Sequence, residues 1–338
     1  MKTALSFDDV LLIPKYSDID SRSEITLEQT VKHVGHISLP IISSPMDTVT
    51  ESKMAAAMHR LGGFGIIHRY NTIQQQATLA RKVIDQGGDC GAAIGINDDF
   101  LERAIALVNT GVGMICIDVA HGHHTKVRYA LAALRNTLGT KVHIMAGNVA
   151  TLQGFNDLAD WGADSIRIGI GGGSICSTRI QTGHSMPTLQ SVIDCAQTDR
   201  DALLIADGGI RTSGDIVKAL AAGADFVMLG SLLAGTEETP GKCFQSTSGE
   251  RRKVYRGMAS PDAQHLWRKR VSSVEGISSS VPYKGPVEDT IKLLETGIRS
   301  GVSYSGALSI AEFRNKATMI RQTPAGQVES TTHIKGRR

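Results

Sequence analysis

The fold follows from a repeating unit whose clearest copy reads Val142-His-Ile-Met-Ala-Gly-Asn-Val-Ala-Thr-Leu-Gln-Gly-Phe-Asn-Asp-Leu-Ala-Asp-Trp-Gly-Ala-Asp-Ser-Ile-Arg-Ile168. Val142 to Ala146 and Ser165 to Ile168 are short apolar runs with the length of buried strands. Between them, Leu152 to Trp161 repeats apolar residues at the spacing of one helix face. A strand, a helix and a second strand in this order predict a βαβ unit, in which the two strands run parallel.

The same unit recurs along the chain. The other apolar runs are Pro40 to Ser43, Phe64 to His68, Gly91 to Ile96, Gly113 to Asp118, Leu203 to Ala206 and Phe226 to Leu229, which brings the predicted strands to eight. The other helical patterns are Ser52 to Leu61, Ile73 to Ile84, Phe100 to Val108, Thr125 to Leu138, Thr188 to Gln197, Ser213 to Ala222 and about Val287 to Ser300. This alternation predicts an α/β protein with a closed (β/α)8 TIM barrel. An open doubly wound sheet is the alternative, but no Gly-x-Gly-x-x-Gly follows the first strand.

Length and composition agree with one barrel. The chain has 338 residues, of which 41% are hydrophobic and 20% charged. We expect a single domain over residues 1–338 with a lid excursion at about residues 236–285, where the sequence is polar and rich in Gly and Ser. The formal charge of +3 favours neither nucleic acid nor an anionic membrane as a partner. No apolar run reaches the roughly 18 residues of a membrane span, and the five cysteines form no Cys-x-x-Cys pair, so we expect a cytoplasmic protein.

In a TIM barrel the active site lies at the carboxyl ends of the strands. The chain presents distinctive stretches there, namely Ser44-Pro-Met-Asp47, His68-Arg69, Asp118 to Gly122, Gly147-Asn148, Gly169 to Arg179, Asp207-Gly-Gly209 and Gly230-Ser231. The loop from Gly169 to Arg179 holds Cys176, a candidate nucleophile, because backbone dipoles and a nearby cation favour the thiolate. A Gly-rich turn with an incidental cysteine explains the spacing equally well.

Two glycine-containing stretches predict a phosphate site. Asp207-Gly-Gly209 and Gly230-Ser231 follow the seventh and eighth strands, where barrel enzymes commonly bind a phosphate on loop amides. Glycines that serve only tight turns are the alternative. Asp207 itself would repel a phosphate, so a sugar hydroxyl is its better partner.

The loop after the fourth strand contains a carboxylate and three histidines. Asp118 could accept hydrogen bonds from a ribose or an amide, or it could cap the following helix. His121, His123 and His124 suggest a metal, but no other His, Asp or Glu cluster completes a ligand set at a recognisable spacing. A structural or substrate-facing loop is therefore the favoured interpretation.

Seven motifs together resemble those of the IMP dehydrogenase/GMP reductase family, in the order in which the family has them. They are Ser6-Phe-Asp-Asp-Val-Leu-Leu-Ile-Pro14, Ser44-Pro-Met-Asp-Thr-Val49, Ala146-Gly-Asn-Val149, the loop Gly169 to Arg179, Asp207-Gly-Gly209, Tyr255-Arg-Gly-Met258 and Val281-Pro-Tyr-Lys-Gly285. The resemblance extends over essentially the whole chain. It implies an oxidoreductase acting on a purine nucleotide, in which Cys176 attacks the purine and a nicotinamide cofactor exchanges a hydride with the covalent adduct.

The resemblance also implies which residues bind each group. The substrate would contact Ser44, Met46, Asn148, Ser174, Asp207, Gly208, Gly209, Gly230, Ser231, Tyr255, Gly257 and Met258. The phosphate part of this set comprises Ser174, Gly209, Gly230, Ser231 and Tyr255, while Asp207 corresponds to the ribose site. The cofactor would face Asp118, Ala120 and His121. A monovalent cation, potassium by likeness, would bind the carbonyl oxygens of Gly171, Gly173 and Cys176, and the assembly would be a homotetramer.

Two activities occur in the family, and the lid separates them. The dehydrogenases oxidise IMP with NAD, hydrolyse the adduct with an Arg-Tyr pair on a long flap, and usually carry two CBS domains after the second strand. This chain has no such insertion after His68-Arg-Tyr70, and its short lid from Met258 to Glu275 has no tyrosine after either arginine. The resemblance therefore favours a GMP reductase, which converts GMP and NADPH to IMP and ammonia. A compact IMP dehydrogenase that lacks CBS domains is the alternative.

Residues of the lid receive roles in the reductase interpretation. Thr178 and Glu275 would handle protons while Cys176 displaces ammonia. Arg268, Lys269 and Arg270 could bind the extra phosphate of NADPH, or they could form a solvated basic loop. A nucleotide-binding sensor without catalysis is a third hypothesis, which would not need the cysteine, threonine and glutamate.

Overall fold

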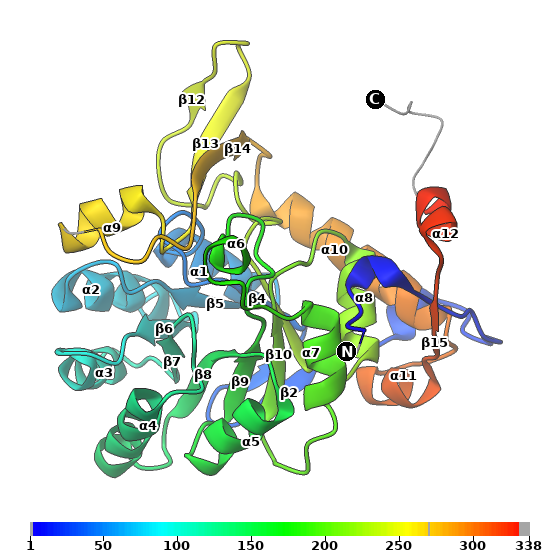
Figure 1. The fold of residues 1–338 in the computed structure, drawn as a ribbon, viewed down its shortest axis with the longest axis horizontal. Helices are drawn as coiled ribbons and strands as arrows, with labels where there is room; N and C mark the ends of the chain where they lie inside the picture. Colours follow the sequence, from blue (N-terminus) through cyan, green and yellow to red (C-terminus); the bar gives the residue numbers. More distant parts are fainter. Residues whose placement is uncertain (1–2, 270, 331–338) are drawn as a thin grey trace.

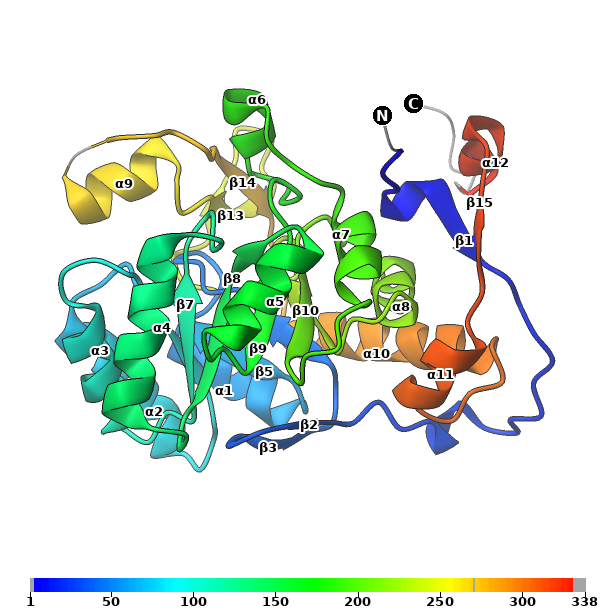
Figure 2. The same cartoon turned by 60° about the horizontal axis from the view of Figure 1, so that its bottom comes forward.

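The computed structural model describes residues 3–269 and 271–330, and it confirms the predicted barrel (Figures 1 and 2). The parallel strands close in the order β10-β11-β4-β5-β6-β7-β8-β9. They are β4 (Ile41–Ser43), β5 (Phe64–Ile67), β6 (Gly91–Ile94), β7 (Met114–Asp118), β8 (His143–Val149), β9 (Ser165–Ile168), β10 (Leu203–Asp207) and β11 (Phe226–Leu229). Each strand overlaps one of the eight apolar runs. All of them end at the same rim, which places the stretches that follow them side by side.

A ring of helices covers the outside of the barrel. It comprises α1 (Ser52–Arg60), α2 (Ile73–Ile84), α3 (Phe100–Val108), α4 (Thr125–Leu138), α5 (Leu152–Asp160), α7 (Thr188–Cys195), α8 (Ser213–Ala221) and α10 (Val287–Ser303). Several begin at clear capping residues: Thr72 and Thr212 form capping boxes with Gln75 and Asp215. Such caps satisfy the free N–H groups of the first turn, which is why the predicted and observed starts agree.

The barrel interior is a packed core. Phe64, Met114, Met145 and Phe226 point inward from four different strands and are at most 1% exposed. A hairpin of β2 (Gln29–Val31) and β3 (Gly35–Ile37) closes the N-terminal end, because its Val31 and Ile37 belong to the same apolar cluster. The sequence analysis did not predict this hairpin.

The excursion after β11 folds into its own small structure above the rim. β12 (Phe244–Gln245), β13 (Arg251–Arg256) and β14 (Ser278–Pro282) form an antiparallel sheet, and α9 (Pro261–Arg268) lies between β13 and β14 in the sequence. The predicted lid excursion is therefore confirmed. Its strands and helix were not predicted, since short polar segments carry little periodicity.

The two ends of the chain meet beside the barrel. β1 (Val10–Leu12), which follows the short helix η1 (Phe7–Asp9), pairs antiparallel with β15 (Met319–Arg321). The remaining helices are η2 (Arg22–Glu24), α6 (Thr178–Thr182), α11 (Ile310–Lys316) and α12 (Pro324–Glu329). Within the described part of the chain, no helix has the length and apolarity needed to cross a bilayer.

One titratable side chain lies inside the barrel near its closed end. His143 is fully buried; its Nδ1 is 3.0 Å from the carbonyl oxygen of Lys32 and its Nε2 is 2.8 Å from Ser165 Oγ. Burial lowers the pKa of His143 below the ordinary value, because the imidazolium would lose its hydration there. The hydrogen bond to the Lys32 carbonyl and the charge of Asp164 oppose this effect only in part.

We therefore expect acid to destabilise the protein through His143. Between its lowered pKa and the unfolded value of about 6.5, the unfolded chain binds the proton and the folded chain does not, so stability falls as the pH decreases. Urea unfolding of the wild type and of His143→Gln at about pH 7 and about pH 5 tests this, because glutamine does not titrate in that range. The wild type should lose more unfolding free energy than the variant, and equal losses would contradict the assignment.

Candidate active site

The loop after β9 carries Cys176 to the rim, where the end of the lid contacts it. Gly169 begins this loop with φ +143°, and a Cβ there would lie 1.9 Å from the carbonyl oxygen of Asp207. Only glycine allows the loop to pass so close to the end of β10. Cys176 then forms an antiparallel bridge with Gly276 of the lid. The candidate nucleophile is thus held between two segments that are far apart in the sequence.

Three predicted catalytic side chains form one hydrogen-bonded chain. The Cys176 thiol donates to Thr178 Oγ1 over 3.2 Å, and the Thr178 hydroxyl donates to Glu275 Oε2 over 2.7 Å. The backbone supports this arrangement, because the N–H of Ser177 donates to the carbonyl oxygen of Glu275 over 2.9 Å. Thr178 is buried, while Cys176 and Glu275 are partly exposed. The chain can carry a proton from the sulfur to a carboxylate at the surface of the site.

Three of the predicted phosphate residues also come together. Tyr255 of β13 is buried, and a Cβ on Gly230 would lie 3.1 Å from its hydroxyl oxygen. Burial raises the pKa of Tyr255 to about 12, although a hydrogen bond with Ser174 acts in the opposite direction. The phenol therefore stays protonated near neutral pH and can donate a hydrogen bond to an anion.

The other predicted phosphate residues lie beside this group. Gly208 and Gly209 follow β10 and pack against the backbone of residues 172–173 in the cysteine loop. Ser231 follows β11, and its carbonyl oxygen accepts a hydrogen bond from Lys284 Nζ over 3.0 Å. Lys284 belongs to the motif Val281-Pro-Tyr-Lys-Gly285, but its place in the sequence alone predicted no role for it. Its ammonium group places a positive charge next to the predicted phosphate loop.

A buried arginine joins the two predicted ribose-facing carboxylates. Arg167 of β9 donates from Nη1 to Asp118 Oδ1 and from Nη2 to Asp207 Oδ2, each over 2.8 Å. Its side chain is 6% exposed. Burial disfavours the ionised form of Asp118, but the charges of Arg167 and Arg69 outweigh it and hold the pKa of Asp118 below the ordinary value. The sequence analysis missed Arg167, although a charged residue inside an apolar strand was the signal.

Asn148 connects this pair of carboxylates to the loop after β7. Its side-chain amide donates to Asp207 Oδ2 over 2.8 Å. Its backbone carbonyl accepts from the N–H of Gly122 over 2.7 Å, and the loop held in this way includes Ala120 and His121. Burial and three neighbouring imidazoles lower the pKa of His121, so its ring is neutral near pH 7.

The other two histidines of this loop have structural partners. His123 Nε2 lies 2.7 Å from Asp157 Oδ2, and its ring packs against Trp161 with centroids 5.9 Å apart. His124 Nδ1 accepts the N–H of Lys126 over 3.0 Å and so caps α4. Over residues 3–269 and 271–330, no group of three His, Cys, Asp or Glu side chains could hold a metal ion. The contacts of His123 and His124 are those of a structural loop.

The residues after β4 lie beside the predicted phosphate residues. Ser44 is buried, and its carbonyl oxygen accepts from Thr50 Oγ1 over 2.7 Å. Met46 packs next to Gly230, where a Cβ would lie 3.2 Å from the methionine sulfur. Both predicted substrate residues therefore stand at the same rim as Cys176.

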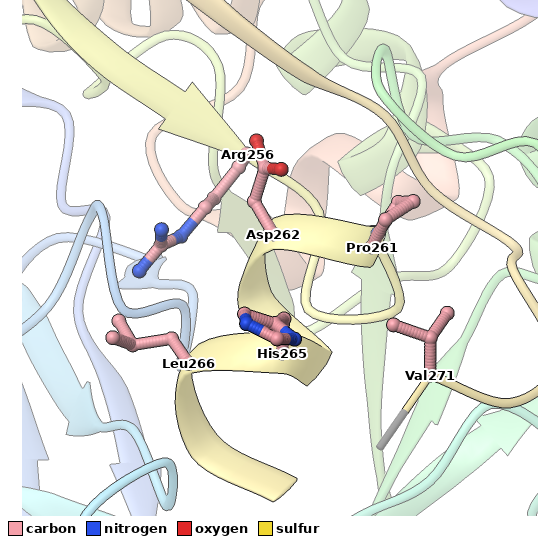
Figure 3. A pocket seen from close by; sticks show the side chains of 6 residues that line it. All are labelled: Arg256, Pro261, Asp262, His265, Leu266 and Val271. Carbon is pink, nitrogen blue, oxygen red and sulfur yellow. The ribbon is translucent and has the colours of Figure 1, made fainter. Parts of the chain in front are cut away.

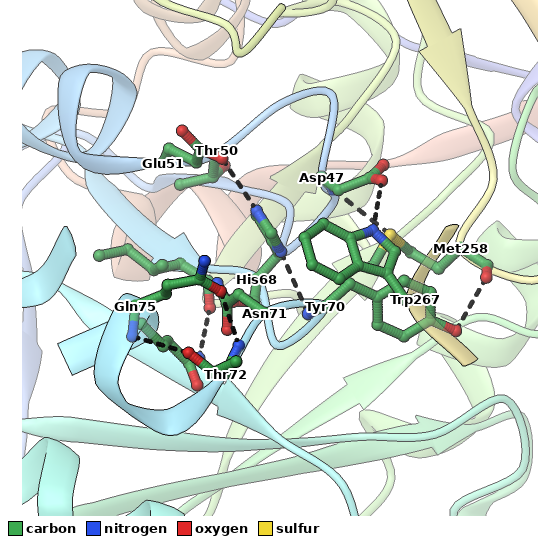
Figure 4. Close-up of polar contacts among 12 residues, drawn as sticks. Asp47, Thr50, Glu51, His68, Tyr70, Asn71, Thr72, Gln75, Met258 and Trp267 are labelled. Carbon is green, nitrogen blue, oxygen red and sulfur yellow. Dashed lines mark hydrogen bonds and ion pairs between the residues drawn. The ribbon is translucent and has the colours of Figure 1, made fainter. Parts of the chain in front are cut away.

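The start of the lid contacts the segments that follow β4 and β5 (Figure 4). Met258 Sδ accepts the backbone N–H of Asp47 over 3.3 Å, and the carbonyl oxygen of Met258 accepts from Tyr70 Oη over 2.8 Å. Gly257 packs on Gly276, since a Cβ at Gly257 would lie 3.3 Å from its Cα. Met258 thus lies against the residue that follows Met46, and the resemblance implies that these two methionines and Gly257 surround the base.

The predicted cofactor cations lie partly outside the described structure. Arg270 and the side chain of Arg268 are not among the described parts of the chain. A pocket of about 440 Å³ lies between α9 and Arg256 at the end of β13 (Figure 3). It is lined by Arg256, Pro261, Asp262, His265, Leu266 and Val271.

The predicted cation ligands are backbone carbonyls of the cysteine loop. Gly171 has φ +79°, which turns the chain tightly at this point. The carbonyl oxygen of Gly173 accepts the N–H of Cys176 over 3.1 Å. A carbonyl oxygen has two lone pairs, so this bond leaves one free for a cation.

Comparisons with known proteins agree with this arrangement. A family model described as the IMP dehydrogenase/GMP reductase domain matches residues 4–333. The chain is 34% identical to an inosine-5'-monophosphate dehydrogenase of Nitrosopumilus maritimus, with 98% of each protein covered. It is 32% identical to a GMP reductase of Leishmania major, with 97% of this chain and 96% of that protein covered.

A solved structure shows the same fold. A cysteine-to-alanine variant of the GMP reductase of Trypanosoma brucei, in complex with guanosine 5'-monophosphate, superposes with a TM-score of 0.94 at 30% sequence identity. The match covers 98% of both chains.

We expect Arg167 to be essential for stability. Arg167→Met would leave the partly buried carboxylate of Asp207 without its cation and that of Asp118 with Arg69 alone, which should cost about 3–5 kcal/mol of unfolding free energy. Arg200→Met is the matched control, because Arg200 also pairs with two carboxylates, those of Asp160 and Asp199, but on the surface. The control should lose at most about 1 kcal/mol. Urea unfolding of both variants measures these losses of unfolding free energy. Similar losses would show that Arg167 stabilises the protein no more than a surface arginine does.

Proposed function

The chain belongs to the IMP dehydrogenase/GMP reductase family, and on this premise we propose that it is a GMP reductase. The reaction would convert GMP to IMP and ammonia, with NADPH as the hydride donor. The similar identities to dehydrogenases and reductases do not separate the two activities. The proposal therefore depends on the residues of the site.

The residues of the lid are the feature that distinguishes the two reactions in this proposal. A dehydrogenase must hydrolyse its adduct, which requires a group that activates water. The stretch from Met258 to Glu275 contains no tyrosine, and its helix α9 lies against the barrel through Trp267. The flap with an Arg-Tyr pair that the family uses for hydrolysis has no counterpart here. A reductase has no hydrolytic step, so this short lid suffices for it.

The length of the relatives gives no such discrimination. The alignments to the Nitrosopumilus dehydrogenase and to the Leishmania reductase extend over 473 and 475 positions, more than the 338 residues of this chain. Relatives of both names therefore carry segments that this chain lacks. The absence of an insertion after β5 supports neither activity over the other.

The hydrogen-bonded chain at Cys176 supports the first half of the reaction. As the sulfur bonds to the purine carbon that bears the amino group, its proton passes to Thr178 while the threonine proton passes to Glu275. Glu275 then gives a proton to the amino nitrogen, the carbon–nitrogen bond breaks, and ammonia leaves. The proton lost by the thiol is thus the one that ammonia carries away.

The second half requires a hydride at the same carbon. When bound, NADPH supplies this hydride. After ammonia has left, Glu275 takes up a proton from solvent. The carbon–sulfur bond then breaks, IMP forms, and the Cys176 thiolate takes up a proton from Thr178 as Glu275 passes the solvent proton to the threonine. Each turnover therefore consumes one proton when ammonia leaves uncharged.

The surrounding residues suit a purine nucleotide. Tyr255 remains a neutral donor for the phosphate, together with Ser174 and the backbone at Gly230. Asp207 would accept from the ribose hydroxyls, because Arg167 and Asn148 hold it in one orientation.

The cofactor and cation assignments remain part of the proposal. Asp118 fits a nicotinamide riboside, since its side chain is 17% exposed and stays charged beside Arg167 and Arg69. The carbonyl oxygens of Gly171, Gly173 and Cys176 fit a potassium ion, which would fix the cysteine loop.

The direct test is absorbance at the nicotinamide band in paired reactions. We expect loss of NADPH absorbance with GMP and no reaction with IMP and NAD. Cys176→Ala should abolish turnover but retain GMP binding, whereas Cys243→Ala, which removes an exposed cysteine, should behave like the wild type. Formation of NADH from IMP would instead establish the compact dehydrogenase, and unchanged behaviour of Cys176→Ala would indicate a sensor.

The proton chain can be tested separately. Thr178→Val and Glu275→Gln should each lower kcat about 10²–10⁴-fold, because each removes a proton-transfer group, with little change in GMP affinity. Thr182→Val is the matched control, since that hydroxyl bonds the carbonyl oxygen of Thr178 and the N–H of His184 at the end of α6. Steady-state kinetics and calorimetric GMP binding distinguish these effects. A variant that lost affinity and kept kcat would point to a binding role.

A further inference from the structure

The lid between Met258 and Glu275 is tied together by one buried glutamine. Gln264 of α9 donates from Nε2 to the carbonyl oxygens of Ala259 and Ser273, over 3.0 and 3.1 Å, and it is 2% exposed. Its Oε1 accepts the N–H of Ser272 over 2.9 Å. The N–H of Glu275 also donates to the carbonyl oxygen of Ala259 over 3.3 Å. Residues 259–269 and 271–275 therefore form one cross-linked unit that ends on Glu275.

This unit meets the barrel through Trp267. Its indole N–H donates to Asp47 Oδ2 over 3.2 Å, and its ring packs against His68 and Tyr70 with centroids 6.3 and 6.5 Å apart (Figure 4). All three partners follow β4 or β5 on the barrel rim. Trp267 thus couples α9 to the barrel through one polar and two ring contacts.

Burial and an ion pair fix the side chain of Asp47 next to Trp267. Its side chain is 2% exposed, and Arg256 at the end of β13 binds it with Nε 3.0 Å from Oδ2. The backbone N–H of Asp47 holds the sulfur of Met258 at the other end of the lid. One residue of the rim therefore contacts the start of the lid, its helix and the strand that leads into it.

We propose that Asp47 is a positioning residue, which fixes the lid through Trp267 and thereby sets Glu275 against Thr178 and Cys176. Asp47 takes no proton in the reaction. When the indole N–H is lost, α9 separates more often from the rim, and Glu275 at the end of the unit spends less time within hydrogen-bonding distance of Thr178. This inference rests on the proposed function in one respect only, namely the choice of the reaction whose kcat is measured.

The first test is Trp267→Phe, which keeps a ring against His68 and Tyr70 but removes the N–H. We expect kcat to fall about tenfold, because the reacting groups are misplaced, while KM for GMP and the thermal midpoint stay near those of the wild type. Leu266→Ala, which alters a 57% exposed side chain of the same helix, is the matched control and should leave kcat unchanged. Full activity of Trp267→Phe would overturn the proposal, and so would an equal loss in the control.

The second test needs no turnover. The chain contains two tryptophans, so Trp161→Phe leaves Trp267 as the only one, and its fluorescence then reports the position of α9. In this background Asp47→Asn should increase quenching by acrylamide and shift the emission to longer wavelength, because the weakened anchor exposes the indole. Unchanged quenching would contradict the proposal that Asp47 holds Trp267 at the rim. Since this readout uses the protein alone, it stands even if paired assays assign the dehydrogenase reaction.

Discussion

Closure of the barrel between its first and last strands is the constraint on which the rest of the structure depends. β11 pairs with β4 in the register Val227 to Ile41 and Leu229 to Ser43. The pairing brings the stretch after Ser43 next to Gly230, although the two lie at opposite ends of the barrel sequence. Met46, Gly230 and Tyr255 can share one site only because this edge is closed. An open sheet would leave these segments apart.

The closed barrel also explains the charges inside it. Strand side chains that point inward must pack, pair or reach the rim. Near the closed end His143 stays neutral between two hydrogen-bonding partners, whereas near the rim Arg167 is charged and neutralised by Asp118 and Asp207. The same guanidinium thus satisfies the packing requirement and orients the carboxylates that face the proposed ligands. The ion pairs of Arg167 with Asp118 and Asp207 therefore serve both the folded structure and the proposed chemistry.

The lid adds what the barrel rim lacks. The rim supplies the sulfur and the threonine, and the carboxylate that completes the proposed proton chain lies on a segment 97 residues beyond that threonine. Its place depends on weak contacts: a bridge at Gly276, the glutamine inside the lid, and the indole on Asp47. Each contact contributes only a small free energy, so the position of Glu275 depends on all of them together.

The amino-acid sequence alone determined the eight strands, the helices between them and the rim stretches, because apolar periodicity and capping residues act over a few neighbours. The motifs around Cys176, Asp207 and Tyr255 further identified the family. Only the tertiary structure decided that Arg167 pairs with two carboxylates, that Asp47 receives Trp267 and that a hairpin closes the barrel. These contacts join residues far apart in the sequence, and no local pattern encodes which distant partner a buried charge or an indole will meet once the chain has folded.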